Sequence, residues 1–320
     1  MNLNSFTKEI KEDICNAYSD LSIEALIPLL SAFIRTLGTL SFRNKNEFLT
    51  LEIENSKVIK FIYRAIKEVL PDIEIHFSFR KGMKLNKSTK YIIEITNPNE
   101  LLKLLYINYL DNKINTSLTN KERKIKTYLS GLFLASGSCN NPKSSNYHLE
   151  LSLKDNDFAL AILKVIKKIK GKNFEFKEIK RRNNYILYLK RSDQISEFLS
   201  FIEANESCLK FERMRLERDF NNVTNRLVNC DVYNYNKTIS NSKKQLSYIE
   251  FIENKIGLES LSNEKIKLLC LLRKEYPEYN YNELALEMSK KLSVNISKSN
   301  INHLFRKIKE LALKLNYEEN

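Results

Sequence analysis

An internal repeat constrains this chain of 320 residues most strongly, because residues 22 to about 110 and 119 to about 203 carry the same order of predicted elements. Each copy opens with an apolar helix that closes on a glycine, Gly38 in one and Gly137 in the other. A strand, a helix, two strands and a last helix follow in both copies. Two related halves of this kind predict an α+β domain with a pseudo-two-fold axis.

The predicted elements of the two copies match segment by segment. The first copy has helices over 22–38, 56–70 and 98–110, with strands over 48–55, 72–79 and 90–96. The second copy has helices over 121–137, 157–170 and 192–203, with strands over 147–154, 173–180 and 184–190. We expect the two closing glycines to take the left-handed conformation that often ends a helix. The first domain is expected to span residues 1–205.

A charged, Asn-rich stretch follows over residues 206–244, and we expect a helix that runs into a linker. Its donors suit phosphate or base contacts, or else a buried polar network between the two domains. Asn also caps helices and forms turns, so a purely structural role stays open for several of these residues. The candidates for DNA or interdomain contacts are Arg218, Asn222, Asn225, Arg226, Asn229 and Lys237.

Residues 245–320 predict a second, smaller, all-α domain. Its helices are expected over 245–256, 262–276, 281–292 and 297–315. Asn280 with Glu283 forms a capping-box pattern at the start of the third helix. Asn295 can supply a left-handed turn between the last two helices. This last pair predicts a helix-turn-helix.

The last predicted helix has one apolar and one polar face. Apolar residues recur at helical spacing at Ile301, Leu304, Phe305, Ile308, Leu311, Ala312 and Leu315. Residues 297–315 carry a net charge of +4, and Ser, Asn and Arg near a helix start suit phosphates and base edges. The alternative is an ordinary amphipathic helix whose basic face is only solvated and binds no partner. We favour DNA binding over this alternative. The predicted DNA-binding residues are Lys298, Ser299, Asn300, Asn302, His303, Arg306, Lys307 and Lys309, with His303 read as a polar surface residue and not as a catalyst.

Composition narrows the partners and the compartment. The net charge of +14 favours nucleic acid first and acidic membrane surfaces second, although a Lys- and Asn-rich chain without Trp also fits AT-rich coding. No apolar run approaches the roughly 18 residues of a membrane span, and the start MNLNSFTKEIKED alternates charge unlike a signal peptide. The five cysteines form no C-x-x-C pair. We expect a cytoplasmic protein with no metal site, no disulfide and no cofactor.

The two opening helices resemble the LAGLIDADG pattern of homing endonucleases, through LSAFIRTLG at 30–38 and LSGLFLASG at 129–137. Ala32 and Gly131 stand where small residues let two helices pack closely. The resemblance implies an acidic metal ligand just before each closing glycine, yet Leu37 and Ser136 occupy those positions. A leucine and a serine cannot hold two catalytic metal ions, so the interpretation is a packed helix seam without enzyme activity.

Four stretches together resemble the WhiA family of bacterial transcription regulators. They are SFTKEIKED, YLSGLFLASGSCNNPKSSNYHLEL, FERMRLERDFNNVTNRLVNCDVYNYNKT and SKSNINHLFRKIKELA. The first half is the more divergent, with Pro28 inside its opening helix. The resemblance implies a degenerate LAGLIDADG-like domain joined to a helix-turn-helix. It also implies a sequence-specific, nucleoid-associated regulator of double-stranded DNA, tied to cell division and chromosome segregation, or to sporulation in some relatives, with other regulatory or cell-division proteins as further partners.

Two other functions stay open at this point. One is a metal-dependent DNA endonuclease that uses carboxylates elsewhere, with Asp13, Asp20, Glu150 and Asp155 available. No acidic pair stands at matching places in the two copies. The other is a protein-docking platform that the helix-turn-helix localises to DNA.

Overall fold

The computed structural model describes residues 5–43, 46–81, 89–109, 111, 113–144 and 146–317. The chain divides into two compact units, Met1–Asp219 and Phe220–Asn320. In the described part of the chain, no helix is long and apolar enough to cross a membrane.

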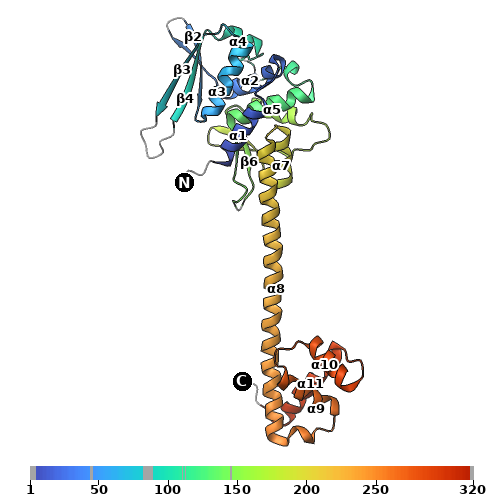
Figure 1. The fold of residues 1–320 in the computed structure, drawn as a ribbon. Helices are drawn as coiled ribbons and strands as arrows, with labels where there is room; N and C mark the ends of the chain where they lie inside the picture. The colour runs from blue at the N-terminus through green and yellow to red at the C-terminus, as the bar shows by residue number, and fades with distance from the viewer. Residues whose placement is uncertain are drawn as a thin grey trace. The chain divides into compact units, whose positions relative to one another are not determined.

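The first half of the first unit is a four-stranded antiparallel sheet with its helices (Figure 1). The elements are α1 (Phe6–Ala17), α2 (Ile23–Leu37), β1 (Thr39–Arg43), β2 (Asn46–Ile53), α3 (Ser56–Val69), β3 (Ile75–Lys81), β4 (Thr89–Thr96) and α4 (Asn99–Leu104). The strand order is β1-β2-β4-β3. Alternate residues of the inner strands, such as Leu49, Leu51 and Ile93, are fully buried, as the period of two requires.

The second half repeats this arrangement. Its elements are η1 (Thr116–Leu118), α5 (Glu122–Ser136), β5 (Gly137–Cys139), β6 (Leu149–Leu153), α6 (Asn156–Ile166), β7 (Lys177–Arg181), β8 (Asn184–Leu189) and α7 (Ser192–Phe201). The order β5-β6-β8-β7 matches that of the first sheet. Even the helix caps correspond, because the side chains of Asn55 and Asp155 accept backbone N–H bonds at the starts of α3 and α6. The predicted pseudo-two-fold α+β domain is confirmed.

Helices α2 and α5 pack tightly against each other at the centre of this unit (Figure 1). A Cβ atom added at Gly131 would lie 2.1 Å from the carbonyl oxygen of Leu29. Ala32, Phe33 and Leu132 are fully buried along the pair. The small residue at 131 therefore lets the two backbones meet, as the sequence predicted.

The closing glycines are required for a different reason from the one expected. Gly38 and Gly137 have φ values of −61° and −72°, so neither is left-handed and that prediction is wrong. A Cβ at Gly38 would lie 2.5 Å from the oxygen of Ile34, and one at Gly137 would lie 2.4 Å from the ring of Phe133. Close packing, and not backbone conformation, excludes a side chain at both positions.

Two short strands were not predicted, and two helices end earlier than expected, since the helix expected over 157–170 ends at Ile166. Strands β1 and β5 were not expected, and the three residues of β5 are too few to show a periodicity. The helix expected over 98–110 ends at Leu104, because Tyr106 is left-handed with φ 55° and the N–H of Ile107 bonds back to the oxygen of Leu102 at 2.8 Å. Leu110 lies outside the described residues.

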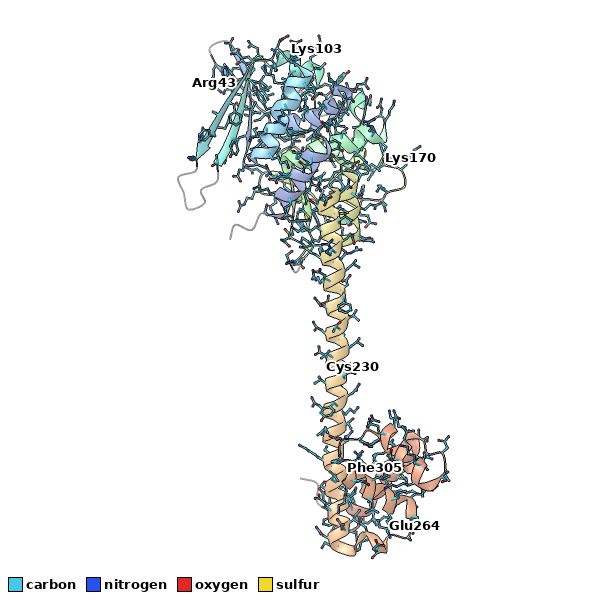
Figure 2. The ribbon with its side chains drawn as sticks, viewed as in Figure 1. Arg43, Lys103, Lys170, Cys230, Glu264 and Phe305 are labelled. Carbon is cyan, nitrogen blue, oxygen red and sulfur yellow. The ribbon has the colours of Figure 1, made fainter. Side chains whose placement is uncertain are left out.

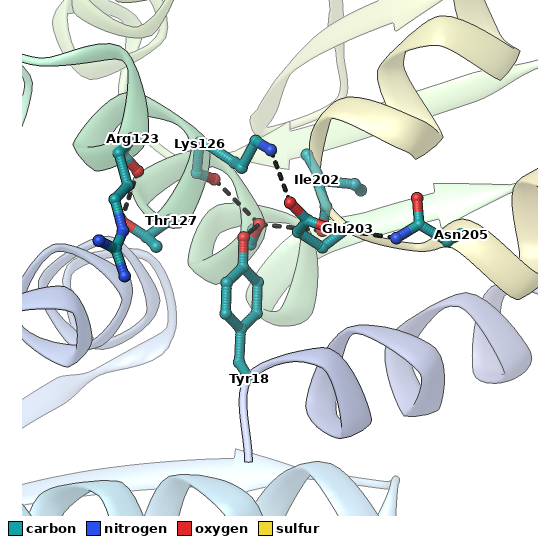
Figure 3. Close-up of polar contacts among 8 residues, drawn as sticks. Tyr18, Arg123, Lys126, Thr127, Ile202, Glu203 and Asn205 are labelled. Carbon is teal, nitrogen blue, oxygen red and sulfur yellow. Dashed lines mark hydrogen bonds and ion pairs between the residues drawn. The ribbon is translucent and has the colours of Figure 1, made fainter. Parts of the chain in front are cut away.

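A polar network ties the start of the chain to α5 and to the end of α7 (Figure 3). The hydroxyl of Ser130 donates to the carbonyls of Lys126 and Ile202, at 2.9 and 3.1 Å, and hydrogen-bonds to the Tyr18 hydroxyl at 3.1 Å. Burial raises the pKa of Tyr18, so this phenol stays protonated. The Lys126 ammonium bonds to the Glu203 carboxylate at 2.6 Å. These contacts join segments far apart in the sequence.

The expected linker is instead part of one long helix. Helix α8 runs without interruption from Asn205 to Ile256, which is 52 residues, and the boundary between the two units falls inside it. No Gly or Pro occurs in this stretch, and Asn only lowers helix propensity without breaking a helix. Gly257, with φ 76°, follows the last helical residue.

The second unit holds a separate core of helices (Figure 1). The C-terminal part of α8 packs with η2 (Leu258–Ser260), α9 (Glu264–Glu275), α10 (Tyr281–Leu292) and α11 (Lys298–Lys314). Buried residues such as Ile249, Leu269, Leu284 and Ile308 fill this core. The predicted small all-α domain is confirmed.

Candidate nucleic-acid interface

Helix α10 begins with the predicted capping box. The side-chain oxygen of Asn280 accepts from the N–H groups of Asn282 and Glu283, at 2.8 and 3.2 Å. The Glu283 carboxylate accepts from the N–H of Asn280 at 2.6 Å. This reciprocal arrangement fixes the residue at which α10 starts.

The turn between α10 and α11 is built differently from the prediction. Ser293, with φ 52°, takes the left-handed conformation that was expected of Asn295. The hydroxyl of Ser289 accepts from the N–H of Ile296 at 2.9 Å, and Ile296 is buried. The next residue, Ser297, caps α11 by accepting from the N–H of Asn300. The turn is thus tied at both ends to the helices it joins.

The apolar stripe of α11 is oriented as predicted (Figure 2 labels Phe305). Ile301 and Ile308 are fully buried, and the ring of Phe305 stacks on Tyr281 with centroids 5.5 Å apart. Leu311 and Leu315 are partly buried against the same core. Packing of this stripe on α10 leaves the rest of α11 in solvent.

The eight residues predicted to contact DNA all lie on the exposed face of α11. They are Lys298, Ser299, Asn300, Asn302, His303, Arg306, Lys307 and Lys309. The ammonium of Lys309 lies 5.9 Å from the centre of the Tyr248 ring, at one border of this face. We call these eight residues the α11 face. It presents amides, hydroxyls and cations from a single rigid element.

One buried cation, Arg273, lies beneath this helix pair and was not predicted from the sequence. Arg273 of α9 is only 1% exposed, and its guanidinium carbon lies 5.3 Å from the centre of the Phe305 ring. Burial lowers the pKa of Arg273 to about 10. A sequence signal existed, because Arg273 follows the apolar Leu269 by four residues and so falls on the same face of α9.

The polar residues of α8 do not form a buried network between the domains, which was one of the two predictions made for them. Asn222, Asn225, Arg226, Asn229 and Lys237 are exposed along the helix, as is Cys230, labelled in Figure 2. Arg218 differs from them. Its guanidinium donates to the Ser144 carbonyl at 3.0 Å and lies 5.1 Å from the centre of the Tyr147 ring, within the first unit.

The ends of the two LAGLIDADG-like helices carry no carboxylate. Leu37 and Ser136 are half-buried, and the Ser136 hydroxyl donates to the Leu132 carbonyl at 3.4 Å. Over the residues that the structure describes, no group of three or more His, Cys, Asp or Glu side chains could hold a metal ion.

The four acids considered for a nuclease have local partners. Asp13 accepts from the N–H of Ser207 at 2.9 Å, and Asp155 caps α6 by accepting from the N–H of Phe158 at 2.8 Å. Glu150 lies 2.9 Å from His148, and Asp20 accepts from the Ser19 hydroxyl at 3.1 Å. The structure does not bring these four carboxylates together as a metal-binding group.

Comparisons with known proteins cover almost the whole chain. Three family models match: the WhiA N-terminal LAGLIDADG-like domain at residues 26–107, the WhiA LAGLIDADG-like domain at 125–221, and the WhiA C-terminal HTH domain at 224–312. Relatives named "Probable cell division protein WhiA" are 38% identical in Bacillus velezensis and in Bacillus subtilis, over 97% of both chains. One in Enterococcus faecalis is 37% identical, over 97% of this chain and 98% of its own.

The fold has also been seen in a crystal. The structure is similar to full-length WhiA from Thermatoga maritima, with a TM-score of 0.58 and 23% identity, over 99% of this chain and 100% of that one. The architecture of a LAGLIDADG-like domain followed by a helix-turn-helix is therefore established from sequence, structure and comparison together. The chain belongs to the WhiA family.

Proposed function

We propose that the chain is a sequence-specific DNA-binding transcription regulator that acts at the nucleoid in cell division and chromosome segregation, and that does not cleave DNA. The observation that carries this proposal is the α11 face, which is exposed, basic and held on a capped, packed helix. A helix of this kind fits the major groove of B-DNA. The name shared by the relatives supports the cell-division role and suggests other division proteins as further partners.

The side chains of the α11 face suit both parts of DNA recognition. Asn300 and Asn302 can hydrogen-bond base edges, which distinguishes sequences. Lys298, Arg306 and Lys307 can neutralise phosphates, which supplies most of the salt-dependent affinity. The proposal therefore separates residues that position the duplex from residues that read it.

We propose that the protein does not cleave DNA because the two positions that would hold catalytic metal ions have lost their acidic residues. Leu37 and Ser136 offer no carboxylate, and the acids considered as substitutes are held by local bonds in separate places. Supercoiled plasmid incubated with the protein and Mg²⁺ or Mn²⁺ should stay intact. Nicked or linear products that disappear in the Asp13→Asn or Glu150→Gln variant would contradict this part of the proposal.

The test of DNA binding is a double variant of α11. Arg306→Ala with Lys307→Ala should weaken binding to genomic duplex fragments, because both side chains are exposed on α11 and lie off its apolar stripe. If each neutralises one phosphate, the slope of log affinity against log salt should fall by about 1.8. The matched control is Lys243→Ala with Lys244→Ala, which removes the same charge from exposed positions of α8.

Circular dichroism of both double variants should match that of the wild type. Equal affinity of the α11 variant and the α8 control would contradict the proposed interface. Loss of helicity in the α11 variant would contradict the assignment of Arg306 and Lys307 to the solvent face.

A further inference from the structure

An open groove of about 1010 Å³ lies within the second unit, beside the start of α11. Helix α8 forms one wall and the segment around the start of α10 forms another. The first turns of α11 contribute Lys298, Ser299 and Asn302, which also belong to the α11 face, and α8 contributes Asn234, Lys237 and Asn241. The groove and the α11 face are therefore one continuous surface.

The chemistry of the groove wall is that of a phosphate-binding surface. Amides, hydroxyls and ammonium groups dominate it, and these are the side chains that contact the sugar–phosphate backbone in protein–DNA complexes. Two acids also line the groove. The carboxylate of Glu283 is already occupied by the N–H of Asn280, and Glu278 is exposed.

A buried cation in the wall points to an anionic ligand. Arg273 lines the groove although it is 1% exposed. One guanidinium nitrogen donates to the carbonyls of Tyr276, Pro277 and Tyr279, at 3.4, 3.2 and 2.7 Å. Its Nε has no hydrogen-bond partner among the described residues. A buried charge held by neutral carbonyls and an aromatic ring, with no carboxylate among these contacts, is stabilised when an anion approaches it.

The start of α11 adds to this preference. Ser297 satisfies the N–H of Asn300, whereas the first N–H groups of any helix lack an intrahelical acceptor. These groups and the helix dipole favour a phosphate at this end. Lys298 and Ser299, which carry the first two N–H groups, line the groove.

We propose that this groove holds the sugar–phosphate backbone of the duplex bound by the α11 face, with Lys237 of α8 neutralising one phosphate. The inference rests on the proposed function and extends it, because it makes α8 part of the DNA interface. A duplex strand is a better occupant than a separate small anion, because Lys298 and Ser299 line the groove and also belong to the α11 face. A backbone that they hold beside the bases read by α11 would therefore lie in the groove.

The test compares Lys237→Gln with Lys243→Gln in the full-length protein. Both remove one exposed ammonium from α8, and only Lys237 lines the groove. The probe is a labelled duplex taken from the genomic segment that the wild-type protein protects from DNase I. Affinity is measured over a series of salt concentrations. Lys237→Gln should lower the salt slope by about 0.9, and Lys243→Gln should leave it unchanged.

Backbone substitution locates the contact on the DNA. Duplexes carrying a single uncharged methylphosphonate are scanned across the protected segment. At one position the modified duplex should weaken wild-type binding yet have no further effect on the Lys237→Gln variant. That pairing would assign the phosphate to Lys237.

The outcomes separate this inference from the proposed function. If Lys237→Gln behaves like Lys243→Gln while the Arg306 and Lys307 double variant loses affinity, the groove is not part of the interface and the proposed function stands. If the wild-type protein protects no DNA segment, the proposed function and this inference both fail.

Discussion

The close approach of α2 and α5 makes Gly131→Ala a sharp test of the first unit. The added methyl carbon would lie 2.1 Å from the oxygen of Leu29 and 2.8 Å from its carbonyl carbon. Both are backbone atoms, so the strain cannot be relieved by turning a side chain, and the helices must separate by about 1 Å to restore van der Waals contact. Overpacking of a tight core costs about 1–3 kcal/mol, and we expect the upper end.

Hydrogen exchange followed by mass spectrometry measures this cost region by region. A loss of about 3 kcal/mol corresponds to roughly a hundredfold faster exchange of the protected amides of α2 and α5. Peptides from α9, α10 and α11 belong to the other unit and serve as an internal control, since their exchange should not change. Arg123→Ala, at an exposed position near the start of α5, is the matched control and should alter stability by less than about 0.5 kcal/mol.

A change of the opposite sign would contradict the close approach of α2 and α5 at Gly131. In a helix with free space, Gly→Ala stabilises by about 1 kcal/mol through helix propensity. Slower exchange in α2 and α5 after Gly131→Ala would show that the two backbones do not meet at this point.

Two further predictions concern cysteines and the helix-turn-helix. Native protein at pH 8 should be alkylated at the exposed Cys230 long before Cys15, Cys139 and Cys270. Burial both hides these three thiols and raises the pKa of each to about 12. If mass spectrometry of partly labelled protein found the three modified first, their burial in the cores of the two units would be contradicted. Asn280→Ala removes the side-chain acceptor of the capping box and should destabilise the second unit by about 1 kcal/mol in urea unfolding, whereas an unchanged midpoint would contradict the cap geometry.

Helical and strand periodicity in the sequence predicted which faces of the main helices and strands are buried. The stripe from Ile301 to Leu315 predicted the buried side of α11, and with it the exposed side, because a helix in contact with one core has only one way to bury that stripe. The matching element order of the two copies predicted two related halves, and the two sheets indeed share one strand order, although β1 and β5 were not expected. The capping box at Asn280 is a local pattern and was read correctly.

Features that depend on tertiary contacts could not be predicted from the sequence. Gly38 and Gly137 do end their helices but are not left-handed, and the atoms that exclude a Cβ there include a carbonyl oxygen and an aromatic ring one turn earlier. Ser293 takes the left-handed turn in place of Asn295, since the bond from the Ile296 N–H to Ser289 fixes where the turn closes. Arg273 could be placed on an inner helix face, yet the groove it lines depends on how α8 meets the start of α10.

We propose that α11 directs this protein to particular DNA sequences, and genome-wide footprinting on the chromosome of its own organism measures this directly. Wild-type protein should occupy a limited set of sites that share one sequence, and the Arg306→Ala, Lys307→Ala variant should lose them at equal protein level. Even coverage of the chromosome by the wild type, or an unchanged set of sites in the variant, would contradict the claim.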